Sequence, residues 1–204
     1  MPTQKNKVKF GLRNVHYAPL TIGDDGTLTF ATPKPWPGAV NLSMDPQGEV
    51  VKFYADDGAY FVNSVNNGYE GDLESALVPE DFKKDVLGEF EDANGALIDD
   101  CDAVATPFAL LFEFQGDKRA RRHVLYNCTA TRPGISSATK EENLEVQTET
   151  VTITASPIKL PTVDKTATKA TLEDSTKQAY TDWYTTVYEP QAVSGSGSGT
   201  STGV

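Results

Sequence analysis

Short segments of alternating apolar and polar residues, divided by turn sequences, run through most of this 204-residue chain. Alternation with a period of two places apolar side chains on one face of a β-strand and polar side chains on the other. Turn signals separate the segments, as at 45–48 (DPQG), 55–58 (ADDG) and 67–68 (NG). The segments do not alternate with long helices, so we predict a mostly-β fold, an antiparallel β-sandwich or barrel.

About eight strands are expected, two of them in a hairpin at 108–132. The other clear strand segments are 8–17, 38–44, 49–54, 59–66, 69–77 and 144–156, with a short one after the Asn94-Gly95 turn. In the hairpin, we expect Phe108, Leu110, Phe112 and Phe114 to share one face of the first strand. Val124, Tyr126, Cys128 and Ala130 should share one face of the second.

Two helices are expected at the margins of the sheet. Residues 79–88 predict a short flanking helix, because Pro79 suits its first turn and Gly88 its end. Apolar residues at helical spacing predict a C-terminal helix over about 172–188, which includes Trp183. The expected organisation is an N-terminal arm (1–10), one β-sandwich domain (11–190) and a flexible Gly/Ser-rich tail (191–204).

The formal net charge of −11 at pH 7 argues against tight or sequence-specific nucleic-acid binding, because an acidic surface repels phosphate. A surface past which DNA must slide would also be acidic. The first ten residues contain no apolar signal-peptide core, and no segment reaches the roughly 18 apolar residues of a membrane helix. We therefore expect the protein to stay in the cytosol of the cell that makes it.

The candidate catalytic residues are too few and too scattered for an enzyme. His16 and His123 have no carboxylate or cysteine at ligand spacing, so both are interpreted as structural. Cys101 and Cys128 are interpreted as small core residues. The common nucleophile, zinc and phosphate-loop motifs are missing from the sequence, which predicts no catalysis, no cofactor and no metal site.

Three carboxylates alternate along the segment 69–77. Glu70, Asp72 and Glu74 should lie on one sheet face about 7 Å apart. A plain solvated face explains this row most simply. The alternative is an electrostatically repellent wall facing a polyanion, which would let DNA pass without sticking.

Two other clusters bear on assembly. Lys118, Arg119, Arg121 and Arg122 lie at the turn of the 108–132 hairpin, where they could pair with acidic residues of a neighbouring subunit or remain solvated. Phe53, Tyr54, Tyr60 and Phe61 flank the turn at 55–58. If that hairpin projects, its aromatic residues could anchor an interface; otherwise they belong to the core.

In sequence texture the chain resembles the major tail proteins, or tail tube proteins, of long-tailed, non-contractile bacteriophages (siphophages). The segments that carry the resemblance are 6–21, 37–48, 53–61, 66–89, 107–134, 139–157 and 180–190. The resemblance implies a β-sandwich with a flanking helix, six-membered rings stacked into a hollow tube, and an acidic lumen that conducts DNA during ejection. It also implies a non-enzymatic virion protein assembled in the host cytoplasm, with other tail proteins (tape measure, tail terminator and distal tail protein) as partners.

These implications give the acidic row and the assembly residues a role. Glu70, Asp72 and Glu74 would face the lumen. The N-terminal arm and the 53–61 hairpin would contact the next ring, and the basic turn a neighbouring subunit. The inter-subunit candidates are Lys5, Lys7, Phe53, Tyr54, Asp56, Asp57, Tyr60, Arg119, Arg121 and Arg122. The alternatives are another ring-forming virion protein of this fold (a tail terminator or baseplate hub), a carbohydrate-binding or cell-surface β-sandwich module, and a hydrolase with an unfamiliar site.

Overall fold

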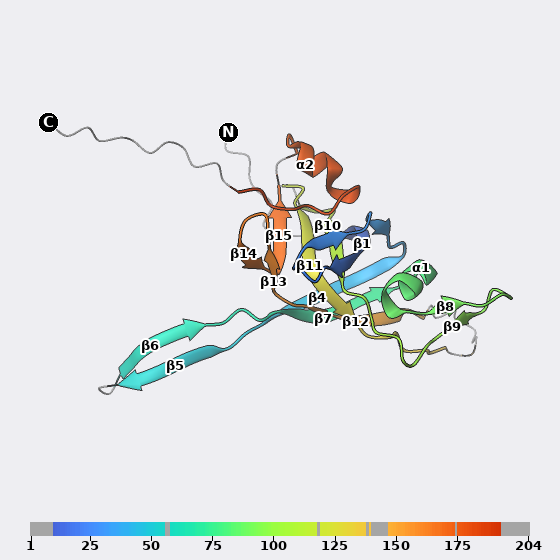
Figure 1. Ribbon diagram of the computed structural model, residues 1–204, viewed down its shortest axis with the longest axis horizontal. Coiled ribbons are helices and arrows are strands. Elements are labelled where there is room, and N and C mark those ends of the chain that lie inside the picture. Colours follow the sequence, from blue (N-terminus) through green and yellow to red (C-terminus); the bar gives the residue numbers. More distant parts are fainter. Residues whose placement is uncertain are drawn as a thin grey trace.

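The computed structural model describes residues 10–55, 58–117, 119–137, 139, 147–173 and 175–192 (Figure 1). The predicted mostly-β class is confirmed, with antiparallel strands and two short helical segments. The strands are β1 Leu12–Ile22, β2 Leu28–Phe30, β3 Lys34–Pro35, β4 Ala39–Gln47, β5 Val50–Ala55, β6 Gly58–Ser64, β7 Gly68–Ser75, β8 Phe90–Glu91, β9 Leu97–Ile98, β10 Phe108–Phe114, β11 Arg122–Ala130, β12 Glu149–Ala155, β13 Ile158–Leu160, β14 Lys165–Ala167 and β15 Lys169–Leu172.

Among the described residues, nine strands form one antiparallel sheet. Its order is β2-β1-β10-β11-β12-β7-β4, with β3 beside β1 and β15 beside β11. Three separate hairpins, β5–β6, β8–β9 and β13–β14, complete the fold. None of the helices in these residues is long and apolar enough to span a membrane.

The sheet buries both of its faces in the middle. Leu110 on β10 packs in one core with Tyr17 of β1 and Leu73 of β7, although β1 and β7 are far apart in the strand order. The sheet therefore folds over on itself around this first core. Ala109 and Leu111 face the opposite way, into a second core that includes Trp183. A strand covered on both faces reads as a continuous apolar run, as FALLF does here.

The flanking helix forms where the sequence predicts it. Helix α1 (Glu80–Phe82) continues as a π-helical turn through Lys83–Leu87 and ends at Gly88, whose φ of 78° is left-handed. The segment inserts Phe82, Val86 and Leu87 into the first core. Phe82 packs its ring edge-on against Tyr17 and Phe108, so the helix closes one end of that core.

The prediction that one face of β11 carries Val124, Tyr126, Cys128 and Ala130 is wrong. Phe108 pairs with Cys128 but Leu110 pairs with Leu125, so β11 contains one extra residue. This β-bulge flips the remainder of the strand. Val124 and Tyr126 enter the second core, whereas Cys128 and Ala130 pack in or against the first.

The predicted C-terminal helix over 172–188 is also wrong in extent. Lys169–Leu172 form β15, which pairs with the first half of β11. Helix α2 covers only Gln178–Thr181 and continues as a 3₁₀ turn over Asp182–Tyr184. The helical spacing nevertheless identified a core residue, because Trp183 is fully buried in the second core.

At the other end of the chain, β1 begins at Leu12 rather than at Val8, which lies outside the described residues. Its pairing with β10 shifts between Arg13 and His16, where Asn14 has a φ of 51°. This irregularity places Val15 and Tyr17 in the first core. The strand segments predicted from the alternation end at residue 156, but β13, β14 and the start of β15 lie in 157–170.

Candidate assembly surfaces

The hairpin β5–β6 projects away from the sheet as a separate arm that continues β4 and β7 (Figure 1). Its described side chains are exposed although many are apolar. Tyr60 is 76% exposed and Phe61 55%, and Val50 and Val51 are similarly exposed. Successive strand residues point to opposite faces, so both faces of the hairpin present apolar surface. The sequence left two alternatives open, a projecting hairpin or core residues, and the structure shows a projecting hairpin.

A hairpin of this kind lacks the usual source of β stability. Two strands alone are marginally stable in water and need a third strand or a packed face. Among the described residues, β5 pairs with no strand other than β6, and β6 with no strand other than β5. Exposed apolar surface concentrated on one projection is typical of a contact site for another molecule.

The acidic row lies on β7, on the face opposite the first core. Glu70 and Asp72 are exposed and Glu74 is half-buried, whereas Leu73 and Ser75 are buried. The neighbouring strands extend this face with Asn41, Ser43, Asp45, Thr150, Thr152 and Thr154. Asp45 lies directly opposite Glu70 and adds a fourth carboxylate that sequence reasoning missed, because the pairing of β4 with β7 was not predicted.

Two threonines hold carboxylates of this row in place. Thr152 Oγ1 donates to Asp72 Oδ1 at 2.8 Å, and Thr148 Oγ1 donates to Glu74 Oε1 at 2.7 Å. A hydroxyl donor stabilises a carboxylate without neutralising it. Among the described residues no cation forms an ion pair with the row. The face is therefore polar, ordered and negatively charged.

Strand β4 is the terminal strand on this side of the sheet. In the described residues its only strand partner is β7, so its other edge carries backbone groups that no ladder uses. An open edge of nine residues invites pairing with another chain. Pro46 near its end removes one donor and limits how far such pairing could extend.

The basic turn has partners within its own chain. Arg121 Nε donates to Asp117 Oδ2 at 2.6 Å, and this bond lowers the pKa of the Asp117 carboxyl. Arg119 forms an exposed ion pair with Glu173 at 3.1 Å. An inter-subunit role for Arg119 and Arg121 stays a prediction, and any such contact competes with these pairs.

Arg122 lies deeper than its neighbours. Its guanidinium lies over the Tyr180 ring, donates to the Tyr180 carbonyl and pairs with Glu113 at 3.2 Å. Glu113 is only 3% exposed and also accepts from Arg13 and Asn14, each at 2.7 Å. A buried carboxylate needs such compensation. Arg122 therefore fastens the C-terminal segment to β10, a structural task that the sequence pattern did not reveal.

Several predicted contact residues cannot be placed. Lys5, Lys7, Asp56 and Asp57 lie outside the described residues, as does Lys118. For Phe53 and Tyr54 only the backbone is described, and it belongs to β5. Their predicted contacts stay predictions.

The two histidines contact backbone, threonine and aromatic groups. His16 Nδ1 lies 3.0 Å from the Asn14 carbonyl oxygen, and His123 stacks on Phe112 with its Nδ1 3.1 Å from Thr171 Oγ1. Cys128 is buried as predicted, and burial raises the pKa of its thiol. Cys101 is exposed, so its assignment to the core is wrong. No group of three or more potential metal ligands occurs within the described ranges.

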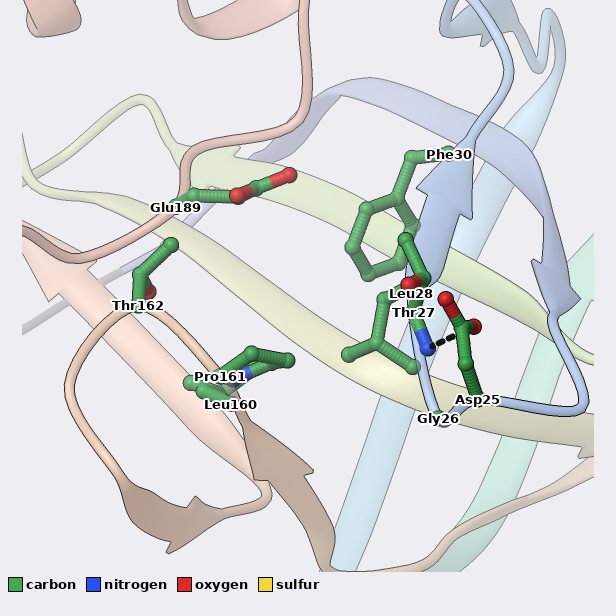
Figure 2. Close-up of a pocket in the computed structure, with 9 residues that line it drawn as sticks. All are labelled: Asp25, Gly26, Thr27, Leu28, Phe30, Leu160, Pro161, Thr162 and Glu189. Atoms are coloured by element: carbon green, nitrogen blue, oxygen red, sulfur yellow. Dashed lines mark hydrogen bonds between the residues drawn. The ribbon is translucent and has the colours of Figure 1, made fainter.

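Figure 2 shows a cavity of about 250 Å³ between β2, the β13–β14 loop and the C-terminal segment. Leu28, Phe30 and Leu160 form its apolar wall. Two carboxylates, Asp25 and Glu189, come from different segments at its border. The Thr27 N–H donates to Asp25 at 3.0 Å, which lowers the pKa of that carboxyl. The cavity combines an apolar floor with negative charge and contains no nucleophile–base pair.

No family model matches the chain, and no curated protein matches it in sequence. Among solved structures it is similar to the cap that terminates the tube of the anti-feeding prophage, determined by cryo-EM, with a TM-score of 0.40 and 11% identity. That likeness covers 85% of this chain and 100% of the cap. At this level of similarity, function has to be argued from the chain's own residues.

Proposed function

We propose that this chain is a non-enzymatic structural subunit that assembles with copies of itself into a phage tail tube, as a major tail protein. Rings of six subunits would stack into a hollow tube through which DNA passes into the host. The ring number and the tube come from the family resemblance of the sequence. The physical support comes from the surfaces described above.

The observation that carries the proposal is the projecting β5–β6 hairpin with exposed Tyr60 and Phe61. Apolar surface on a two-stranded projection is costly for a chain that works alone. A contact between a projection on one copy and a different surface on the next is heterologous, and repeating it generates a ring or an open filament. The open edge of β4 offers a second route to assembly, because pairing it with a neighbouring copy would remove the exposed edge.

The acidic face supports the second half of the proposal, passage of DNA. Along the row Glu70, Asp72 and Glu74, neighbouring residues lie about 7 Å apart. That spacing is within the Debye length of about 8 Å at physiological salt, so the fields of neighbouring carboxylates reinforce. A wall of this kind offers phosphates no cation to replace their counterions and therefore does not retain DNA. We propose that β4, β7 and β12 turn this face toward the lumen.

Charge reversal tests the lumen assignment. Tubes or tailed particles carrying Glu70→Lys, Asp72→Lys and Glu74→Lys should still assemble but should release DNA more slowly or not at all. The matched control reverses the same number of exposed carboxylates elsewhere, at Asp24, Glu80 and Asp102. Release measured by dye binding to ejected DNA should be near normal in the control. Normal release from the row variant would exclude these residues from the lumen.

The N-terminal arm can be tested separately. Deleting residues 2–7 removes Lys5 and Lys7 without reaching any described element. We expect the truncated chain to give soluble subunits or single rings, with tubes shortened or lost in negative-stain electron microscopy. Tubes of normal length would rule out a ring-to-ring role for the arm.

A further inference from the structure

A second cavity, of about 170 Å³, lies where the inward residues of β4 and β7 face β10 and β11. Its walls are apolar and largely aromatic. Leu42, Met44, Tyr69, Phe112, Phe114, His123, Val124, Leu125 and Lys169 line it. Lys169 lies at 4.7 Å over the Tyr69 ring and has no ion-pair partner among the described residues. The cavity thus combines an aromatic interior with one available cation.

We propose that this cavity receives the side chain of Tyr60 from the β5–β6 hairpin of a second copy of the chain. The inference rests on the proposed self-assembly and specifies the contact that links one copy to the next. Tyr60 is the most exposed aromatic residue described on the hairpin, and the contact would bury it. The contact is heterologous, because the hairpin and the cavity are different surfaces of the same molecule.

Size and chemistry suit one aromatic ring. A cavity of about 150 Å³ lined by apolar side chains is large enough to bind benzene. Aromatic walls such as Phe112 and Phe114 offer edge-to-face contacts to an entering ring. Tyrosine also carries a hydroxyl that stays near polar groups when its ring is buried. His123 and Lys169 provide such groups in the lining.

Charge favours this cavity over the one in Figure 2. In the sequence, Asp56 and Asp57 stand between Ala55, where β5 ends, and Gly58, where β6 begins, so two negative charges precede Tyr60 by four and three residues. Lys169 would attract them. In the other cavity, Asp25 and Glu189 would repel them (Figure 2). Like charges brought together at an interface are strongly unfavourable and exclude wrong partners.

The hairpin of the same copy does not reach its own cavity. Met44 lines the cavity, and Ala55 at the end of β5 follows 11 residues later. At about 3.3 Å per residue, an extended segment of that length spans roughly 36 Å. Figure 1 shows the hairpin directed away from the sheet along this path. The ring that fills the cavity must therefore come from another copy.

Cross-linking between two differently labelled chains tests the contact. In a Cys101→Ser background, one chain carries Gly58→Cys at the open end of the hairpin, which leaves Tyr60 in place. The other chain carries Thr171→Cys, an exposed residue beside His123 that leaves Lys169 in place. A short bis-maleimide should link the two chains when they are mixed under assembly conditions. The control partner carries Thr162→Cys, an exposed residue at the cavity of Figure 2, and should give no linked product. Cys128 is fully buried and is left unchanged.

A charge swap provides the second readout. Lys169→Glu should lower the yield of the 58–171 product about tenfold or more at low salt, because two negative surfaces then meet. Adding Asp56→Lys and Asp57→Lys to the partner should restore it. Linkage of residue 58 to residue 162, or no linkage to residue 171, would overturn the proposal. If tubes form without the 58–171 product, only this contact is wrong; if no polymer forms at all, the proposed function fails with it.

Discussion

The sheet and the hairpin of this chain are built from the same kind of sequence, yet they have opposite surroundings. In the sheet, β10 buries both faces, and residues such as Leu110 and Leu111 enter two separate cores. In β5–β6, residues such as Tyr60 and Phe61 are exposed. Apolar alternation therefore shows that one face of a strand has to be buried. It does not show whether that face is buried by the same chain or by another molecule. Predictions for matched substitutions in the two regions test this distinction.

The largest effect on folding is expected at Phe82. Its ring is fully buried against Tyr17, Trp36 and Phe108. Phe82→Ala should lower the free energy of unfolding by about 3–5 kcal/mol, because it leaves a cavity that the core cannot fill. Urea denaturation followed by tryptophan fluorescence measures the change. A loss below about 1 kcal/mol would mean that α1 does not close the first core.

A pair of glycines gives the next contrast. A Cβ at Gly71 would lie 1.8 Å from the Ser43 carbonyl oxygen, so Gly71→Ala must push β4 and β7 apart. We expect a loss of about 1–3 kcal/mol in unfolding free energy. Gly58 in the hairpin has no atom within 4 Å of the corresponding position, and Gly58→Ala should leave stability almost unchanged. Equal losses at the two glycines would contradict the difference in packing.

Asp117 should give a pH-dependent effect within the sheet region. Its pKa is lowered by the bond from Arg121, so its contribution is present at neutral pH and lost as pH falls below its ordinary 3.8 and through the lowered value. Asp117→Asn should cost about 1–2 kcal/mol at pH 7 and converge with the parent chain in strong acid. Asp45→Asn on the exposed acidic face is the control and should change little. Parallel stability curves for Asp117→Asn and the parent would refute the ion pair's role.

The smallest effect on folding is expected in the hairpin. Replacing Tyr60 and Phe61 together by serine removes apolar surface that is exposed in the single chain. The unfolding free energy of the monomer should change by less than about 0.5 kcal/mol. A larger loss, measured at a concentration where the chain is monomeric, would show that the hairpin packs on its own chain.

Sequence patterns predicted the parts of this fold that depend on neighbours along the chain. Period-two alternation located β4, β7 and β12. In the segment 79–88, Pro79 marked the start of the helix and Gly88 marked its end. The sequence did not predict that the side chains of β11 change faces partway along the strand. Val124, Leu125 and Tyr126 are all apolar, so each of them is compatible with either face. A bulge depends on pairing with β10, which local spacing does not encode.

Some features of the candidate surfaces could likewise be predicted from the sequence, and others required the strand pairing of the structure. The shared face of Glu70, Asp72 and Glu74 follows from alternation alone, but its extension by Asp45 needed the β4–β7 pairing. The role of Arg122 within its own chain was not foreseen, because Tyr180 is 58 residues away in sequence and becomes its neighbour only through the fold. For Tyr60, the residue type gave the apolar surface, and only the structure shows that its own chain leaves it exposed.

Assembly of the purified chain tests the central claim most directly. A concentration series of the parent chain and of the Tyr60→Ser, Phe61→Ser variant should be followed by sedimentation velocity and negative-stain electron microscopy. We predict hollow polymers with a central channel for the parent, and soluble subunits of parental stability for the variant. A parent chain that stays monomeric at every concentration, or a variant that polymerises as well as the parent, would contradict it.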